Sequence, residues 1–185
     1  MRIIAGQYRG TALASVGKGD TAAHLRPTTD RVRESLFSVL THHDVLENAR
    51  VLDLFAGTGA LGLEALSRGA EHVCLVDDGR VALGLIRQNI AKLRAEPQTD
   101  IIKRDALRLP PCQTAPFDLV FLDPPYGKDM GQKALAVAQA GGWLTAEAFV
   151  VWEETRPMQP PDGFTLLDHR RYGDTHVTLL AQTAV

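Results

Sequence analysis

The sequence predicts a single α/β domain with a doubly wound, mostly parallel sheet that is completed by an antiparallel hairpin. From residue 50 onward, short apolar runs alternate with helical patterns. The apolar runs show little polar alternation, as expected of parallel strands that are covered on both faces. Residues 165–182 form two β-rich runs around Tyr172-Gly173-Asp174, which is typical of an antiparallel hairpin. A length of 185 residues suits one domain of this kind.

The N-terminal segment has a different pattern. Residues 1–25 are polar and interrupted by glycines, and RIIAGQYRGTAL predicts one or two short strands. The next segment, RPTTDRVRESLFSVL, changes to helical spacing, with Thr29 or Asp30 placed to cap the start of a helix. Arg31 and Arg33 fall outside the apolar stripe of this helix, so both are expected on its polar side.

The alternating part of the chain predicts five strands and three helices. The strands are expected at residues 50–55, 72–77, 100–106, 117–123 and 148–154. The helices are expected at residues 56–69, 80–95 and 129–141. Gly69 is a suitable C-cap for the first of these helices, and Pro97 is expected to stop the second.

The composition is ordinary for a globular protein, but the charge is unevenly distributed. The chain is 45% hydrophobic and 23% charged with a net charge of -2, which excludes a disordered chain and a uniformly basic nucleic-acid binder. Residues 1–33 nevertheless carry two acids and six basic residues: Arg2, Arg9, Lys18, Arg26, Arg31 and Arg33. A basic front on an acidic body predicts that a polyanion binds at one end of the molecule.

The sequence favours a soluble, cytoplasmic protein without a structural metal. Cys74 and Cys112 lie in unrelated contexts and form no Cys/His ligand set, which is typical of reduced thiols in the cytosol. The first residues lack the apolar stretch of a signal peptide, and no run of about eighteen apolar residues predicts a membrane span.

A glycine-rich turn follows the first predicted strand. Gly57, Gly59 and Gly62 stand where that strand gives way to a helix, so the backbone can approach a ligand closely and offer the helix N-terminus. The spacing formally matches the dinucleotide fingerprint, which keeps a nicotinamide-dependent oxidoreductase open. A tight strand-to-helix turn that binds no ligand is the structural alternative.

Acidic residues stand at the ends of three successive predicted strands. Asp77 closes the second strand, where an acid can bind ribose hydroxyls, and Asp53 lies beside the glycine turn. Asp53 would repel a pyrophosphate but could meet the ammonium of an amino acid, and Asp105 could accept from an adenine amino group. Each acid alone could be a solvated strand end or a helix cap, but ligands of open α/β sheets bind along this edge. Together they favour S-adenosylmethionine over NAD.

The fourth predicted strand ends in Asp123-Pro124-Pro125-Tyr126. The two prolines fix an extended turn and remove two backbone donors, so the neighbourhood is rich in acceptors. The Asp123 carboxylate and the Pro124 carbonyl are an acceptor pair suited to an exocyclic amino group, and Tyr126 offers a face on which a base can stack. The structural alternative is an ordinary turn with a core tyrosine.

These motifs resemble a known family. The Asp-Pro-Pro-Tyr turn together with DLFAGTGALGLEALSRGA is similar to class I methyltransferases that act on an amino nitrogen, which have a Rossmann-like fold. The segments MRIIAGQYRG, RPTTDRVRESLFSVL and RYGDTHVTLL resemble the RsmD family, the guanine-N2 methyltransferases of 16S rRNA. The resemblance covers residues 1 to about 180 and implies an RNA-facing extension at residues 1–40 before a methyltransferase domain at residues 41–185.

The resemblance also implies roles for individual residues. It places S-adenosylmethionine against Asp53, Phe55, Gly57, Gly59, Asp77, Asp105 and Ala106. It assigns catalysis to Asp123, Pro124 and Tyr126, and guanine or RNA binding to Pro125, Arg2, Arg9, Arg26, Arg31 and Arg33. The implied partner is 16S rRNA in the small ribosomal subunit or its assembly intermediate, bound by a monomer that needs no metal.

Three other functions stay open from the sequence. The first is another amino methyltransferase, acting on adenine N6 of DNA or RNA or on a protein amide. The second is a non-catalytic RNA-binding assembly factor that keeps the fold, and the third is the nicotinamide oxidoreductase. Asp rather than Asn before the two prolines, and the basic N-terminal segment, favour rRNA guanine. Arg170, Arg171 and Tyr172, at the predicted hairpin turn, suit a solvated turn and an RNA contact equally.

Overall fold

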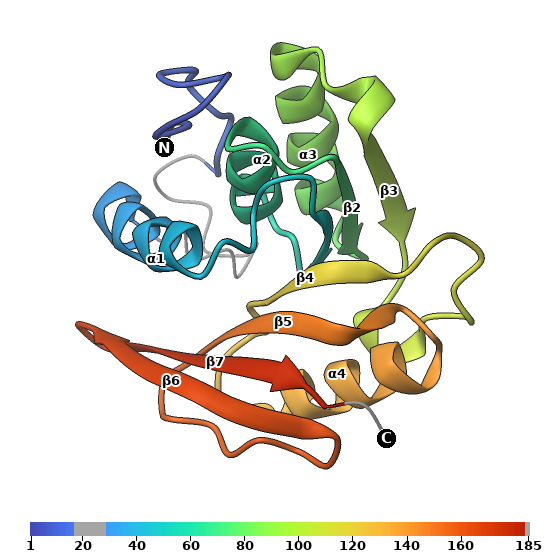
Figure 1. Cartoon of the computed structure of the whole chain (residues 1–185). Helices are drawn as coiled ribbons and strands as arrows, with labels where there is room; N and C mark the ends of the chain where they lie inside the picture. The colour runs from blue at the N-terminus through green and yellow to red at the C-terminus, as the bar shows by residue number, and fades with distance from the viewer. Residues whose placement is uncertain (17–28, 184–185) are drawn as a thin grey trace.

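The computed structural model describes residues 1–16 and 29–183, whose strands form one seven-stranded sheet with helices on both faces (Figure 1). The strand order is β3-β2-β1-β4-β5-β7-β6. The strands are β1 (Arg50–Leu54), β2 (His72–Asp77), β3 (Thr99–Lys103), β4 (Phe117–Leu122), β5 (Leu144–Glu154), β6 (Phe164–Tyr172) and β7 (Thr175–Gln182). The helices are α1 (Asp30–His42), α2 (Ala60–Ser67), α3 (Arg80–Leu93) and α4 (Met130–Ala140), with short 3-10 turns η2 (Glu96–Gln98) and η3 (Ala106–Arg108).

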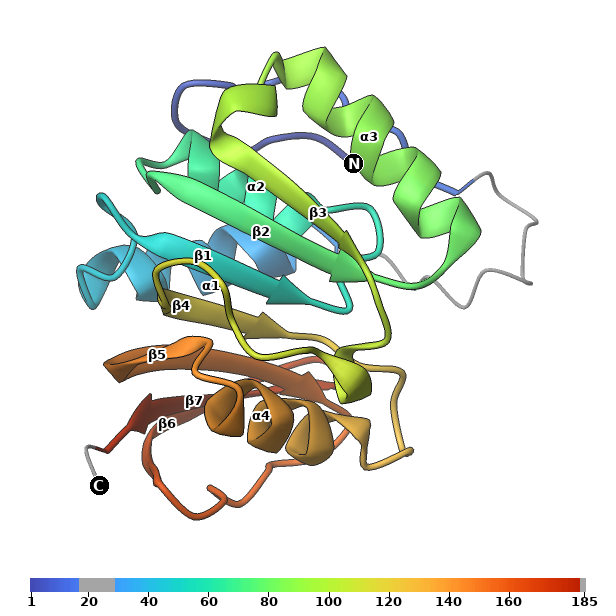
Figure 2. The same ribbon diagram turned by 90° about the vertical axis from the view of Figure 1, so that its right-hand side faces the viewer.

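The strand directions confirm the predicted doubly wound sheet. Strands β1 to β5 pair in parallel, and Figure 2 shows β1, β2 and β4 running the same way. Strands β6 and β7 form the predicted antiparallel hairpin, and β7 pairs with β5, so that the hairpin extends the sheet. Parallel strands bring all their carboxyl ends to one edge, here called the carboxyl edge.

Two hydrophobic clusters pack against the two faces of the sheet. One contains Phe37 of α1, Leu63 of α2 and Ile86 of α3 together with Val51 and Phe121 of the sheet. The other joins Leu135 and its neighbours on α4 to the opposite side chains of β1, β4 and β5. Side chains alternate along each strand, so every strand contributes to both clusters. This alternation decides which face each residue at the carboxyl edge points toward.

The first sixteen residues, here called the leader, form no regular strand. The only ladder contact described for them is an isolated bridge between Arg2 and Ala12. The leader docks instead on α2, where the amides of Ile4 and Ala5 donate to the Glu64 carboxylate at 2.8 and 3.1 Å. Ile3 is fully buried in the cluster that covers α2. The leader is therefore an extended segment fastened to the domain.

The predicted first helix is confirmed, but the prediction for Arg33 is wrong. Thr29 is the N-cap of α1, and its hydroxyl accepts from the Val32 amide at 3.3 Å. The Arg33 side chain is fully buried, since its guanidinium donates to Asp30 Oδ1 at 2.7 Å and lies 3.7 Å from Glu64 Oε2. An arginine that is buried beside these two acids cannot face an RNA phosphate.

Candidate active site

The predicted acids meet at the carboxyl edge. Asp53 lies beside Leu75 of β2 and Phe121 of β4 in the parallel register, and Asp77 is the last residue of β2. Asp123 directly follows the end of β4, on the other side of β1. The structure therefore brings Asp53, Asp77 and Asp123 together around the point where β1 turns into α2.

The glycine loop, residues 55–62, has a backbone that few side chains permit. Phe55 has a φ of 61°, and Gly59, the N-cap of α2, has a φ of 78°. The Gly57 amide donates to Asp77 Oδ2 at 2.9 Å, and the Gly79 amide donates to Asp77 Oδ1 at 2.8 Å. Asp77 thus holds two loops in place, a structural role that its position in the sequence did not reveal.

Asp53 is a buried carboxyl in contact with the start of α2. Its Oδ2 accepts from the Gly62 amide at 2.9 Å, and a side chain at Gly62 would lie 2.7 Å from Val73, so only glycine fits there. Burial raises the pKa of Asp53 to about 7, with smaller contributions from the charges of Asp77 and Glu153. A carboxyl of this kind is half neutral near pH 7 and ionises fully when a cation binds beside it.

Asp105 and Ala106 lie between β3 and β4 in the sequence. Asp105 caps η3, because its Oδ1 accepts from the Leu107 amide at 2.9 Å, and Arg108 Nε lies 3.8 Å from its Oδ2. Ala106 is buried in the cluster on the α4 side. The capping bond leaves Asp105 with further acceptor positions, so its assignment to the adenine amino group stays a prediction.

The Asp123–Tyr126 turn closes the other side of the site. Asp123 and Tyr126 are partly exposed, Pro124 is buried and Pro125 is exposed. Burial raises the pKa of Asp123 well above its usual range, and the charges of Glu153, Asp53 and Glu154 raise it further. Asp53 pairs with Phe121 in the parallel register, and Asp123 stands two residues after Phe121, so the predicted amino-group acceptor lies on the same edge of the sheet as the predicted cofactor acid.

Glu153 and Glu154, at the end of β5, are site residues that we did not predict. They are 1% and 4% exposed, and Glu154 Oε1 accepts from the Gly127 amide at 3.3 Å. The residue two positions before each of Asp53, Asp123 and Glu153 belongs to the cluster that contains Phe37 of α1, here called the α1-facing cluster. These three acids therefore lie on one face of the sheet. The signal was present in the sequence, since VVWEE also ends an apolar strand in acids.

The arginines predicted to bind RNA lie in different places. Arg2 is 69% exposed and 3.8 Å from Asp30, while Arg31 is exposed on the first turn of α1. Met1 Sδ lies 3.8 Å from Thr58 Oγ1, so this end of the leader borders the glycine loop. Arg9 is exposed beside residues that dock on Ser67, at the far end of α2. Arg26 lies outside the described residues.

The tip of the C-terminal hairpin lies near the carboxyl edge. Glu154 of β5 pairs with His176 of β7, and His176 pairs with Arg171 of β6. Arg170 and Arg171 are exposed, whereas Tyr172 is partly buried against the α1-facing cluster. The position of the tip is compatible with the RNA contact that the sequence left open.

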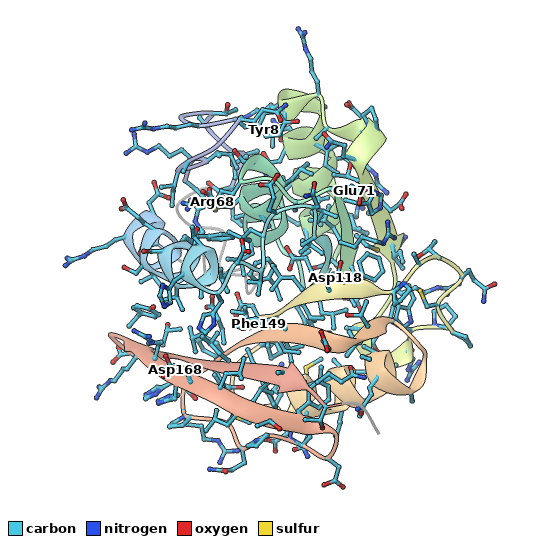
Figure 3. The ribbon with its side chains drawn as sticks, in the orientation of Figure 1. Tyr8, Arg68, Glu71, Asp118, Phe149 and Asp168 are labelled. Atoms are coloured by element: carbon cyan, nitrogen blue, oxygen red, sulfur yellow. The ribbon has the colours of Figure 1, made fainter. Side chains whose placement is uncertain are left out.

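A shallow depression of about 550 Å³ lies at the opposite end of the strands. It is lined by leader residues Gly6 and Gln7, the end of α2 and residues around Glu71. Glu71 and Asp118 lie near the amino ends of β2 and β4, and Arg68 lies on the side of α2 toward α1 (Figure 3). The carboxyl-edge acids do not line this depression, so we assign the site from their geometry.

Residues 1–16 and 29–183 contain neither a membrane-spanning helix nor a metal-binding cluster. No helix among them is long and apolar enough to cross a membrane. No group of three or more His, Cys, Asp or Glu side chains in residues 1–16 and 29–183 is arranged to hold a metal ion.

Comparison with known proteins identifies the family. The family described as Conserved hypothetical protein 95 matches residues 1–181. The ribosomal RNA small subunit methyltransferase D of Haemophilus influenzae is 35% identical over 178 residues, covering 94% of this chain and 89% of that protein. The protein of the same name from Escherichia coli K12 is 38% identical over 153 residues, covering 83% of this chain and 74% of its own.

Solved structures agree with this relationship. The methyltransferase yhhF of Escherichia coli has a TM-score of 0.85 and 34% identity, covering 100% of this chain and 99% of its own. The methylase HI0767 of Haemophilus influenzae has a TM-score of 0.77 and 30% identity, covering 98% of each chain. The fold is thus the Rossmann-like methyltransferase fold, and the chain belongs to the RsmD family of methyltransferases.

Proposed function

We propose that this protein transfers a methyl group from S-adenosylmethionine to the exocyclic N2 of a guanine in 16S rRNA. The observation that carries the proposal is the position of Asp123, which begins the Asp-Pro-Pro-Tyr turn at the end of β4, on the same edge of the sheet as Asp53 beside the glycine loop. An acceptor for an amino group and an acid suited to a cationic cofactor therefore share one edge of the sheet.

The residues of the glycine loop fit S-adenosylmethionine better than a dinucleotide. A buried acid whose pKa lies near 7 suits an ammonium group and disfavours a pyrophosphate. Asp77 keeps free lone pairs for ribose hydroxyls while it accepts from Gly57 and Gly79. Asp53, Phe55, Gly57, Gly59, Asp77, Asp105 and Ala106 are the residues that we assign to the cofactor. When bound, it supplies an electrophilic methyl group on a sulfonium.

The residues of the second motif are suited to hold the guanine amine. Asp123 and the Pro124 carbonyl would accept the two N2 hydrogens, which orients the nitrogen lone pair toward the methyl donor. The N2 lone pair is delocalised, so a carboxylate that offsets the positive charge developing on nitrogen lowers the barrier. Tyr126 would stack on the base, and the exposed Pro125 would contact it. The proton leaves N2 after the methyl transfer.

The name of the curated relatives supports ribosomal RNA of the small subunit as the substrate. Arg2 is an exposed cation next to Met1, which borders the glycine loop. Arg31 is exposed on the first turn of α1, next to the Asp30 that lies 3.8 Å from Arg2, so the phosphates of a bound RNA would lie along this end of the leader. A guanine within folded RNA must leave its stack to reach the turn, which costs a few kcal/mol. The proposal includes a monomeric, cytoplasmic enzyme that works without a metal.

The test is methyl transfer to purified small subunits that lack the modification. Labelled S-adenosylmethionine is incubated with subunits and protein, and the rRNA nucleosides are separated by mass spectrometry. We expect label in N2-methylguanosine at one site in 16S rRNA. Label in N6-methyladenosine would instead identify adenine as the base that the protein methylates. Tight binding of NADH without binding of S-adenosylmethionine would instead identify an oxidoreductase.

A further inference from the structure

Asn89 joins the leader to the glycine loop. It lies on α3 and is fully buried, although an amide is costly to bury unless its polar atoms are bonded. Its Oδ1 accepts from the Ala14 amide at 2.6 Å, and its Nδ2 donates to the Ala14 carbonyl at 3.1 Å. The same Nδ2 donates to the Thr58 carbonyl at 2.9 Å. One side chain therefore bonds both a leader peptide and the glycine loop.

The leader touches the glycine loop at a second point. The Thr58 hydroxyl donates to Met1 Sδ at 3.8 Å, so Thr58 is held on its backbone by Asn89 and on its side chain by the leader. Thr58 itself lies between Gly57 and Gly59, both of which have positive φ angles. Phe55, at the start of the same loop, is not a glycine and has a φ of 61°, a conformation that persists only where surrounding contacts hold it.

We propose that Asn89 is a positioning residue that couples docking of the leader to the conformation of the glycine loop, and hence to cofactor binding. When the leader is docked, the bonds to Ala14 hold the Asn89 amide in the orientation in which it bonds the Thr58 carbonyl. When cofactor fixes the glycine loop, the bond to Thr58 holds the same amide in the orientation in which it bonds Ala14. Coupling of two sites through one element is reciprocal, so each event strengthens the other. The inference rests on the proposed function, because it takes the glycine loop as the S-adenosylmethionine site.

The position of the leader would let this coupling link RNA binding to cofactor binding. The exposed Arg2 is part of the leader, and the first turn of α1 is bonded to it, because Arg33 donates to the Arg2 carbonyl at 2.6 Å. A polyanion that fixes this end of the molecule would therefore also favour the loop conformation that binds cofactor. A cofactor that fixes the loop would favour the docked leader.

The test compares two substitutions at the two ends of the Asn89 link in the full-length protein. Asn89→Ala removes all three bonds, whereas Ala14→Pro removes only the leader amide and leaves the helices and sheet unchanged. We expect each to weaken S-adenosylmethionine binding by roughly fivefold or more in calorimetric titration, the lower end of typical coupling between sites. The double substitution should cost much less than the product of the two single effects.

Hydrogen exchange supplies the readout that a purely structural role would not move. In the wild type, S-adenosylmethionine should slow exchange at Leu13 and Ala14, and in Asn89→Ala it should not. Ser67→Ala is the matched control, because Ser67 bonds Tyr8 and Ala5 at the far end of α2. It should speed exchange at residues 5–8 and leave cofactor affinity within about twofold of wild type.

Three outcomes decide the inference. Cofactor binding with unchanged exchange in the leader overturns the coupling while the proposed function stands. Unchanged affinity in Ala14→Pro overturns it as well, even if Asn89→Ala fails to fold. Failure of the wild type to bind S-adenosylmethionine overturns the proposed function, and the coupling to cofactor with it.

Discussion

At the scale of single residues, the site is a group of carboxyls that the fold keeps close together in a poorly hydrated place. Burial raises the pKa of both Asp53 and Asp123, and the charge of Glu153 raises both further, because like charges on one face of a sheet disfavour joint ionisation. Such a group is costly when empty and becomes favourable when a cation arrives. The proposed cofactor carries both a sulfonium and an ammonium, so it matches the charge that these residues need.

Asp123→Asn should bind cofactor nearly as well as the wild type and lose most of its turnover. Asn replaces one acceptor oxygen by a donor, and it cannot offset charge on the guanine N2. Loss of one preorganised interaction of this kind costs about 10²–10³ in rate. Single-turnover methyl transfer on unmodified small subunits measures this loss of rate.

The turnover of the wild type should also depend on pH. Because the pKa of Asp123 is raised, wild-type turnover should fall as pH decreases through that pKa, and Asp123→Asn should not show this fall. A rate within about threefold of wild type would show that Asp123 only shapes the turn.

Asp53→Asn should reduce the loss of stability that the protein undergoes between acidic and neutral pH. The folded carboxyl has its pKa raised from 3.8 to about 7, so the folded state binds the proton more tightly than the unfolded state. Stability is therefore lost as pH rises from about 4 to about 7, by at most ~4 kcal/mol from this group. Urea unfolding of the cofactor-free protein at pH 5 and pH 8 measures the difference.

The control for that measurement is Asp118→Asn. Asp118 is an exposed acid on β4 that accepts from the Arg50 amide at 2.9 Å, far from the carboxyl edge. It should keep the wild-type change in unfolding free energy between the two pH values. An equal change in Asp53→Asn would mean that Asp53 titrates normally in the folded protein.

The sequence predicted where three acids lie, because that depends only on their place along a strand. Asp53, Asp77 and Asp123 were recognisable because an acid that ends an apolar strand of a parallel sheet must lie at the ligand edge. The roles of Arg33 and Asn89 depend on partners 31 and 75 residues away, such as the Arg2 carbonyl and Ala14, which no local pattern specifies. Arg33 was assigned to the polar face from the pattern of its own helix. That pattern does not show its buried partner Glu64, which belongs to another helix.

At the scale of elements, strong local patterns gave correct helices and strands, and their ends were less well predicted. Helix α3 ends at Leu93, and its C-cap Arg94 adopts a φ of 53°, three residues before the Pro97 that we expected to stop it. Strand β5 begins at Leu144, four residues earlier than predicted. The predicted leader strands are absent from the described residues because the leader bonds to side chains of α2 and α3.

Glu64→Gln should destabilise the protein by ~3 kcal/mol, because it leaves buried Arg33 without its full countercharge. It also places an amide donor among donors, since Ile4, Ala5 and Arg68 all donate to this carboxylate. Chemical denaturation gives the change in the free energy of unfolding. Glu71→Gln, at an exposed position next to β2, should change it by less than about 0.5 kcal/mol. Equal effects of the two substitutions would show that Glu64 does not hold the leader.

At the scale of the whole molecule, the relevant feature is where the exposed cations lie relative to the site. Arg2 follows Met1, which borders the glycine loop, and Arg31 follows the Asp30 that lies 3.8 Å from Arg2, whereas Arg9 lies at the other end of α2. The net charge is -2, so a polyanion is attracted locally and not by the molecule as a whole.

Arg2→Gln with Arg31→Gln should lower kcat/KM for the small subunit by at least about tenfold and leave cofactor affinity unchanged. Each lost phosphate contact should also reduce the slope of log affinity against log salt by about one. Arg9→Gln with Arg94→Gln removes the same charge from exposed positions at the far ends of α2 and α3 and is the matched control. Equal losses in the two double variants would mean that overall charge, and not this end of the molecule, attracts RNA.

The attachment of the leader also has a consequence for the order in which the chain folds during synthesis. Its hydrogen-bond partners lie 60 residues downstream at Glu64, 59 at Ser67 and 75 at Asn89. At ordinary rates of translation, 75 residues take about 4–15 s to make. Ile3 and Leu13 are buried in the finished protein, so they must wait in contact with water until α3 emerges. The leader therefore finds its place only after about half of the 185 residues have been made.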